Sequence, residues 1–334
     1  MSFQNIKGQE KAIQLLQEHM RADRLRNGFL FVGPEGVGKM LTAKTLAKTL
    51  NCEREALDSC DTCVSCRKIE KNQHPDIHII DARTPITIES EREMSDAGGS
   101  EAIKINHIRQ LQKEISLRPY EGKRKVFIID DAHQMTAAAS NALLKILEEP
   151  PASSLIVLVS AHPALFFRTI TSRCQIVKFY SLERSSLEKL LKSDFGLDKY
   201  RAHFLAYFCE GRIGSAIKLM ETDCMAEKNR VIDEFFSSPR KQREGEAFDR
   251  ATVRQALAIL ASWYRDLYIA KTGMPQEELI HLDRKDELSQ QLQRFSFLDL
   301  QNRIDLITET LVYVQQNVNI KLLLSNLKAG LWNR

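Results

Sequence analysis

The sequence has no long hydrophobic run, no leader-like start and no strong excess of charge. None of its apolar stretches approaches the roughly 20 residues that a membrane-spanning helix needs. Residues 1–10 lack the charged start and apolar middle of a signal peptide. Lysine and arginine exceed aspartate and glutamate by only four, 48 against 44, so that any contact with nucleic acid must be local. We therefore expect a soluble cytoplasmic protein, without a membrane partner, whose 334 residues fold as two or three domains.

The cysteines are unevenly distributed along the chain. Three of the seven, Cys174, Cys209 and Cys224, are scattered and are expected to be buried small apolar residues. The other four lie within fifteen residues, and the missing secretion signal argues against disulfides. Their spacing predicts a tetrahedral zinc site, with reactive or incidental thiols as the alternative. Four thiolates would close the coordination shell, so this metal should stabilise a loop without catalysing; the predicted ligands are Cys52, Cys60, Cys63 and Cys66.

A glycine-rich stretch at residues 33–40 has every element of a phosphate-binding loop except the last. It stands between an apolar run and a helical pattern, as such a loop requires. In these loops glycines let backbone N–H groups surround phosphate oxygens, and a lysine pairs with the β and γ phosphates. The predicted nucleotide-binding residues are Gly33, Gly36, Gly38 and Lys39. Met40 replaces the hydroxyl that holds Mg²⁺, so we expect either a bound, poorly hydrolysed nucleotide or an empty relic site.

Three further polar residues end predicted strands. Asp130 and Asp131 follow the apolar run 126–129, which predicts a buried strand. The carboxyl ends of parallel strands meet at one edge, where ligands bind in open α/β folds, so Asp130 is placed to hold Mg²⁺ through water, with Asp131 beside it. Ser160 ends the run 155–160 near the expected γ phosphate. A strand-end serine is more often structural, and an acidic strand end can be a solvated turn.

The order of the patterns predicts an α/β fold, a parallel sheet with helices on both faces. Strands are expected at 29–32, 77–81, 126–129, 155–160 and 176–179, with the cysteine module inserted at one edge. Thr136 is the expected N-cap of a helix at 137–149. The acidic segment 84–101 is expected to be a mobile loop without chemistry. His74 and His78 are expected in surface or turn positions and not as metal ligands.

No strand pattern returns after Tyr180. Short helical patterns fill 182–220, and longer ones continue to the last residues. We predict domains at 1–180, 181–224 and 225–334: a nucleotide-binding-like domain, a small helical domain and a second helical domain. The apolar stripe in 298–331 is typical of a bundle core, with an oligomerisation surface as the sharper interpretation. Its members are Ile304, Ile307, Leu311, Val314 and Val318.

Taken together, these motifs resemble the AAA+ clamp-loader subunits of bacterial DNA polymerase III, most of all the delta-prime type. The resemblance covers residues 1–180 with high specificity, whereas the C-terminal third is supported only by helical character and length. The residues that carry it are the phosphate loop, the four-cysteine module, His74-Pro75-Asp76, Asp130-Asp131-Ala132-His133, the run 141–151 (NALLKILEEPP) and Thr171-Ser172-Arg173-Cys174-Gln175.

The resemblance implies a RecA-like AAA+ ATPase domain, a lid, and a collar that closes five subunits into a ring that loads the sliding clamp onto primed DNA. The implied partners are gamma/tau-like and delta-like subunits, the clamp, and primer-template DNA through the complex. It also implies that Arg173 is an arginine finger supplied in trans. Three departures weaken hydrolysis: Met40 stands where hydrolysing members carry Thr or Ser, Asp131 where they carry the catalytic Glu, and Gly214 where they carry a sensor arginine.

Three functions remain open on the sequence. The leading one is an assembly and stator subunit that lends Arg173 to a neighbour and does not turn over ATP alone. The second is a gamma/tau-like motor that hydrolyses ATP itself, with Thr42 or water replacing the missing Mg²⁺ ligand. The third is a stand-alone zinc-dependent nucleic-acid binder, ranked last because the cysteine module lacks dense basic and aromatic residues.

Overall fold

The computed structural model describes residues 1–22, 25–85, 102–237, 249–316 and 318–332. The chain divides into two compact units, one of residues 1–182 with 212–214, the other of residues 183–211 with 215–334. The predicted boundary between separate lid and collar domains stays a prediction. Most of the expected acidic loop, from residue 86 to residue 101, lies outside the described residues. No described helix is both long and apolar enough to cross a membrane.

The first unit is built on a five-stranded sheet of order β2-β3-β4-β1-β5, and every pair of neighbouring strands is parallel. All five expected strands are present, within a residue or two of their predicted ends. Because the strands are parallel, their carboxyl ends share one edge and their amino ends the opposite edge. The strands are β1 Gly28–Val32, β2 Ile77–Ile80, β3 Lys125–Ile129, β4 Ser154–Ser160 and β5 Gln175–Lys178.

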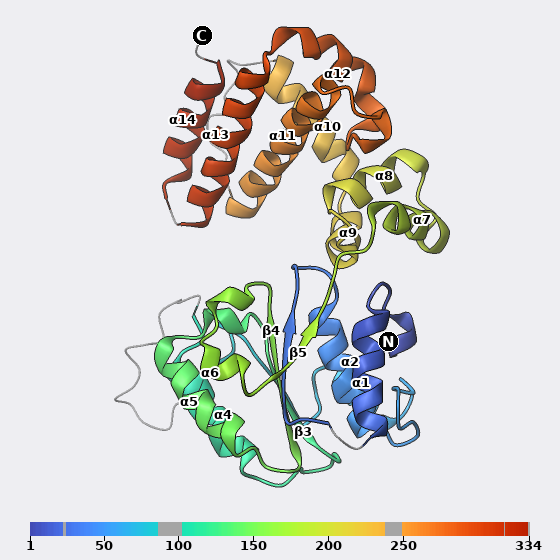
Figure 1. Cartoon of the computed structure of the whole chain (residues 1–334), viewed down its shortest axis with the longest axis vertical. Helices are drawn as coiled ribbons and strands as arrows, with labels where there is room; N and C mark the ends of the chain where they lie inside the picture. Colours follow the sequence, from blue (N-terminus) through green and yellow to red (C-terminus); the bar gives the residue numbers. More distant parts are fainter. Residues whose placement is uncertain (23–24, 86–101, 238–248, 317, 333–334) are drawn as a thin grey trace. The chain divides into compact units, whose positions relative to one another are not determined.

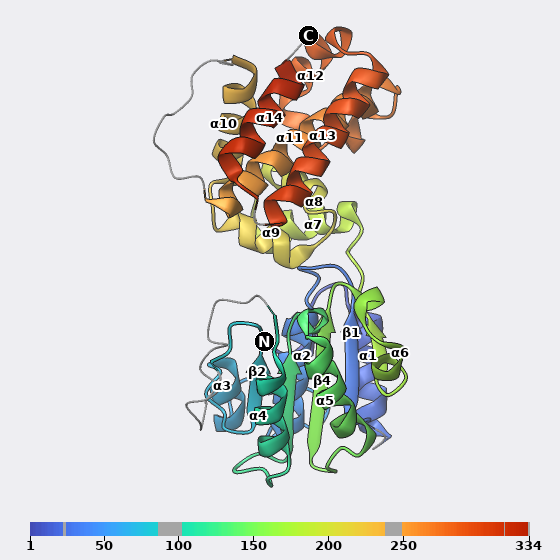
Figure 2. The ribbon, with the colours of Figure 1, turned by 90° about the vertical axis from the view of Figure 1, so that its left-hand side faces the viewer.

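Helices cover both faces of this sheet, as the sequence predicted (Figure 1). Alternate residues of one strand enter different cores: Phe29 and Phe31 pack with α1 and α2, whereas Leu30 packs with α4 and α5. Figure 2 shows α3 beside β2, the outermost strand of the sheet. The cysteine module therefore lies alongside this strand. The helices are α1 Glu10–Arg21, α2 Lys39–Asn51, α3 Val64–Glu70, α4 Ile105–Ile115, α5 Ala137–Glu148 and α6 Arg168–Thr171, with one-turn helices η1 Phe3–Asn5, η3 Ala132–Gln134 and η4 Pro163–Leu165.

The described part of the second unit is helical. In the expected apolar stripe Ile307 and Val314 are buried in its core, which confirms the bundle-core interpretation. The helices α11, α13 and α14 lie side by side, with α13 in contact with both of the others (Figures 1 and 2). The elements are α7 Arg184–Phe195, α8 Lys199–Phe208, α9 Ile213–Met220, α10 Cys224–Ser237, α11 Arg250–Lys271, α12 Lys285–Gln291, α13 Phe297–Gln315 and α14 Ile320–Trp332, with η5 Gln276–Glu278, η6 Leu282–Arg284 and η7 Leu292–Arg294.

Candidate functional site

The phosphate loop connects β1 to α2 at the carboxyl edge of the sheet. Gly36 and Gly38 have φ of 75° and 102°, a region that side-chain-bearing residues rarely adopt. Gly33 is fixed sterically as well, because a Cβ there would lie 2.3 Å from the carbonyl oxygen of Phe179. Gly38 is the N-cap of α2. The expected glycines therefore let the backbone form a concave turn in front of a helix N-terminus, where backbone N–H groups favour an anion.

Lys39 is buried within this loop. Its Nζ donates hydrogen bonds to the carbonyl oxygens of Gly33 at 2.7 Å and Pro34 at 2.6 Å. Burial lowers the pKa of Lys39, while the nearby carboxylates, Asp130 foremost, act against that shift. The ammonium group is therefore held by the loop's own carbonyls, from which a phosphate could recruit it.

Neither Met40, which follows Lys39 directly, nor Thr42 offers a suitable Mg²⁺ ligand. Met40 packs its side chain against the core formed by α1, α2 and the sheet. Thr42 is fully buried, and its hydroxyl donates to the carbonyl oxygen of Gly38 at 2.9 Å. The idea that Thr42 replaces the missing hydroxyl is therefore not supported, because its side chain is bonded to its own helix and shielded from the loop.

The strand-end residues Asp130, Asp131 and Ser160 reach the same edge as the loop. Ser160 is paired in register with Val32, the residue before the loop, and its carbonyl accepts the N–H of Gly33 at 3.3 Å. Burial, and then the neighbouring Asp131, raise the pKa of Asp130. Asp131 has a φ of 43° and so turns away from the strand direction. The edge therefore carries a half-buried carboxylate, Asp130, whose charge acts on Lys39, as a Mg²⁺-dependent phosphate site requires.

Ser160 has partners that the sequence did not reveal. Its hydroxyl lies 3.2 Å from Nδ1 of His133 and accepts the N–H of His162 at 2.9 Å. The two imidazole rings meet edge to face with their centroids 4.7 Å apart. Burial lowers the pKa of His133, so the ring is neutral near pH 7. The hydroxyl is thus engaged with the histidines on its own edge, and its predicted contact with a nucleotide stays a prediction.

Gly214, the expected sensor position, contacts the phosphate loop. Residues 212–214 belong to the first unit. The N–H of Gly214 donates to the carbonyl oxygen of Gly36 at 2.7 Å. A Cβ at this position would lie 2.7 Å from that same oxygen, so a larger residue would require the contact to open. The glycine therefore contributes a backbone contact to the loop in place of a cationic side chain.

Arg173 lies at the amino edge, opposite its own phosphate loop. It lies between α6 and β5. Its carbonyl oxygen would be 3.5 Å from a Cβ atom added to Gly28, the first residue of β1. The loop begins after the other end of β1, four strand steps or roughly 13 Å away. The guanidinium pairs with Glu148 at 2.8 Å and remains 35 % exposed. Arg173 therefore lies on a flank of the domain, away from the chain's own loop.

The four cysteines Cys52, Cys60, Cys63 and Cys66 form one cluster. All four sulfur atoms lie within 4.8 Å of one another, and no described cysteine forms a disulfide. A tetrahedral zinc with Zn–S bonds of about 2.3 Å would need sulfurs about 3.8 Å apart, which this cluster reaches with small shifts. Backbone N–H groups of Glu55, Cys63 and Cys66 donate to three of the sulfurs, as they do to thiolates. The donor set fits a structural metal ion, and the cluster can bind one.

Hydrogen bonds also favour the ionised form of one of these thiols. Burial acts to raise the pKa of Cys60, but hydrogen bonds from Thr62 and from the N–H of Cys63 outweigh it and lower the pKa to about 6. The scattered cysteines differ, since all three are buried as expected, and burial raises the pKa of Cys174 to about 12.

The motif His74-Pro75-Asp76 proved to be structural. Asp76 is fully buried, and its carboxylate accepts the N–H groups of Tyr120, Glu121 and Gly122 at 2.7 to 2.9 Å. Of the expected surface or turn positions, His74 takes the turn: it is buried, and its Nδ1 accepts the N–H of Asp76. His78 takes neither, because it lies within β2. The motif thus fixes the loop that leads into β3. The signal for this structural role in the sequence was a carboxylate that follows a proline directly before an edge strand.

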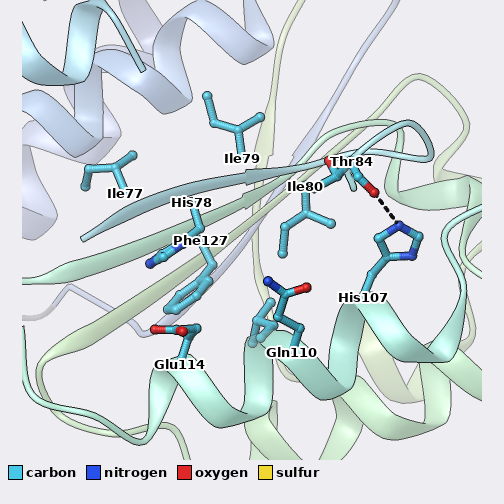
Figure 3. Close-up of a pocket in the computed structure, with 10 residues that line it drawn as sticks. Ile77, His78, Ile79, Ile80, Thr84, His107, Gln110, Glu114 and Phe127 are labelled. Carbon is cyan, nitrogen blue, oxygen red and sulfur yellow. Dashed lines mark hydrogen bonds between the residues drawn. The ribbon is translucent and has the colours of Figure 1, made fainter. Parts of the chain in front are cut away.

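A cavity of about 220 Å³ lies between β2 and α4 (Figure 3). Five of its ten lining residues are apolar and five are polar. His78 stacks on Phe127 with ring centroids 4.7 Å apart, and its buried Nε2 has no hydrogen-bond partner among the described residues. His107 closes one end through a contact of 3.1 Å to the carbonyl of Thr84. Because β2 is three strands away from β1, this cavity cannot serve the phosphate loop.

Comparison with known proteins agrees with this geometry. Residues 8–183 match the family model described as "DNA polymerase III, delta subunit", and residues 239–328 match its C-terminal counterpart. DNA polymerase III subunit delta' of Bacillus subtilis is 29% identical over 96% of this chain and 94% of its own length. Subunit tau of Escherichia coli is 31% identical over 66% of this chain, but only 32% of tau is covered.

A solved structure, a DNA polymerase III gamma subunit-related protein from Thermotoga maritima, covers 95% of this chain and 97% of its own at 20% identity. Its TM-score is 0.45, so the assignment does not depend on it. The family model spans more than half of the 334 residues and contains the phosphate loop, the cysteine cluster and Arg173. The chain therefore belongs to the DNA polymerase III delta-subunit family.

Proposed function

We propose that this chain is a delta-prime-type stator of the DNA polymerase III clamp loader. In this role it helps to load the sliding clamp onto primed DNA by completing a nucleotide site that belongs to a neighbouring subunit. Its similarity to the delta' subunit over nearly the whole length of both chains supports this type. The partners are gamma/tau-like and delta-like subunits in a hetero-pentamer, the clamp, and primer-template DNA through the complex.

The position of Arg173 is the observation that carries the proposal. The guanidinium lies at the amino edge of the sheet, whereas the chain's own phosphate loop lies at the carboxyl edge. A guanidinium is permanently charged and forms a planar fork that suits phosphate oxygens. From the amino edge it can reach only a phosphate that another subunit presents. Supplied in trans, it would stabilise the charge that develops on the transferred phosphoryl group.

The chain's own nucleotide site supports a stator in preference to a motor. Asp131 is one methylene shorter than glutamate, and Met40 and Gly214 supply neither a Mg²⁺ ligand nor a cation. Each loss removes an interaction that a hydrolytic transition state needs. We propose that the loop, with Lys39 and Asp130, holds a nucleotide without appreciable turnover. Zinc on the four cysteines would have a structural role.

The gamma/tau-like motor is the second candidate. The intact glycines and Lys39 of the phosphate loop, together with the similarity to tau, favour it. Its weakness is the Mg²⁺ ligand, because Thr42 is buried against its own helix. Steady ATP turnover by the isolated chain at rates near an ordinary enzyme's, 1 s⁻¹ or more in order of magnitude, would favour the motor.

The test is Arg173→Ala in a loader reconstituted from this chain and its partner subunits. Assembly and the folding of the chain should be unchanged, since the side chain is partly exposed. The ATPase activity stimulated by clamp and primed DNA should fall by roughly 10³-fold if the finger acts in trans. An assembled variant loader with unchanged ATPase and clamp loading would return Arg173 to the class of surface arginines.

A further inference from the structure

Glu148 contacts the guanidinium of Arg173. Its Oε1 forms an ion pair with Nη2 at 2.8 Å, while Nη1 donates to the carbonyl oxygen of Thr169 at 3.0 Å. The two side chains are 51 % and 35 % exposed. The guanidinium is therefore held by Glu148 and Thr169, with a longer contact of 3.5 Å from Nη1 to the Ser172 hydroxyl, and the side chain still reaches solvent.

Both acceptors stand on elements that are fixed to one core. Leu143, Ile146 and Leu147 bury the inner face of α5, and Ile170 buries that of α6 in the same cluster. The turn after α5 is tied to the start of β1, because Asn27 Nδ2 donates to the carbonyls of Pro150 and Pro151 at 3.5 and 3.4 Å. The backbone that carries Glu148 is therefore held in place at both ends of the turn.

The location of Glu148 is unfavourable when its helix is considered alone. It is the last residue of α5, where the unpaired carbonyls carry partial negative charge that repels a carboxylate. Glu149 follows directly and makes no ion pair within the described part of the chain. Of these two adjacent acids only Glu148 meets a cation, which indicates that its charge serves Arg173.

We propose that Glu148 is a positioning residue for Arg173, one that holds the guanidinium in the conformation that meets the neighbour's phosphate; this rests on the proposed function. A guanidinium has five N–H groups, and the contacts with Glu148, Thr169 and Ser172 leave two of them for a ligand. A long arginine side chain loses much rotamer freedom when it binds, and Glu148 reduces that loss in advance. Because the pair is exposed, its attraction is too weak to compete with a phosphate.

The experiment compares Glu148→Gln with its neighbour Glu149→Gln in the reconstituted loader. Glutamine keeps the shape of the side chain and removes the charge. We expect Glu148→Gln to lower kcat of the clamp- and DNA-stimulated ATPase by about fivefold, the scale of one exposed ion pair, with KM for ATP unchanged. Glu149→Gln should match the wild type. Gel filtration should show full assembly for both variants.

A double variant separates positioning from a general structural effect. Added to Arg173→Ala, Glu148→Gln should cause no further loss, because Glu148 acts through the arginine. An equal loss with and without Arg173, or wild-type kcat in Glu148→Gln, would overturn the inference and leave the stator function standing. An Arg173→Ala loader with full activity would overturn the proposed function itself, and the inference with it.

Discussion

The two edges of the sheet in the first unit differ in what they retain. The carboxyl edge has the geometry of a phosphate site, with the loop glycines, Lys39 and Asp130, but lacks a hydroxyl after the lysine. The amino edge has no phosphate loop, yet it carries Arg173, held by Glu148 and open to solvent. Under the proposed function, the difference means that one domain lacks parts of its own nucleotide site and supplies a part of its neighbour's.

The contrast between the two edges is tested most directly at Arg173. Arg173→Lys keeps the charge and removes the planar fork, so we expect it to recover little of the activity that alanine loses. The loader's stimulated ATPase should remain about 10²-fold or more below the wild type. Steady-state ATP hydrolysis in the reconstituted complex measures this. Near-normal activity of the lysine variant would mean that a point charge suffices, and the fork argument would be wrong.

The cysteine module lies at neither the carboxyl edge nor the amino edge of the sheet, and it serves as a separate site for comparison with both. We expect elemental analysis to find about one zinc per chain. Cys63→Ser should lower that content and destabilise the module by several kcal/mol in order of magnitude, because zinc binding stabilises the fold of such small sites. Limited proteolysis within residues 52–70 should report the loss.

Cys174→Ser is the matched control for the module, because Cys174 is buried outside the cluster. Its metal content should equal that of the wild type. Nucleotide binding at the phosphate loop should be unchanged in both variants. A metal-free native protein that is fully stable would contradict the zinc assignment.

Asp76 tests how firmly the amino edge is built. In Asp76→Asn one side-chain N–H₂ must face backbone donors that the carboxylate now satisfies, so the free energy of unfolding should fall by about 2–3 kcal/mol. Chemical denaturation measures this, with exposed Asp305→Asn as a control that should change little.

The same substitution should change the dependence of stability on pH. Burial acts to raise the pKa of Asp76, but the three backbone donors outweigh it and hold the pKa below its ordinary value. The stabilisation is therefore complete above the unfolded-state pKa of about 3.9 and is lost as pH falls through the folded value. The difference between wild type and Asp76→Asn should shrink below about pH 4. A difference that grows on acidification would contradict this assignment.

The smallest effect is expected at the carboxyl edge. Met40→Thr supplies the missing hydroxyl and should strengthen binding of Mg²⁺-nucleotide to the isolated chain by about tenfold, without appreciable turnover, because Asp131 and Gly214 are unchanged. Met40→Val has a similar shape but no hydroxyl and should not strengthen binding. Titration with and without Mg²⁺ measures the effect. Turnover in Met40→Thr would show that the other two departures matter less than proposed.

Much of the architecture followed from local patterns. Alternating and continuous apolar runs placed the five strands, because a parallel sheet covered on both faces buries every strand residue. Thr136 was predicted as an N-cap, and its hydroxyl does accept the N–H of Ala139. Close cysteine spacing predicted the cluster, since short loops can bring sulfurs together without distant contacts. These features depend on residues near one another in sequence.

Only the tertiary structure decided which distant residues meet. The sequence alone did not indicate that Asp76 binds the N–H groups of residues 120–122, that Glu148 holds Arg173, or that His133 engages Ser160. Each contact joins segments that lie together because parallel strands align their ends, and single side chains leave no periodic pattern for such pairing. The sequence determined the elements and the residues that carry charge, and the packing of the sheet decided which of them face a common edge.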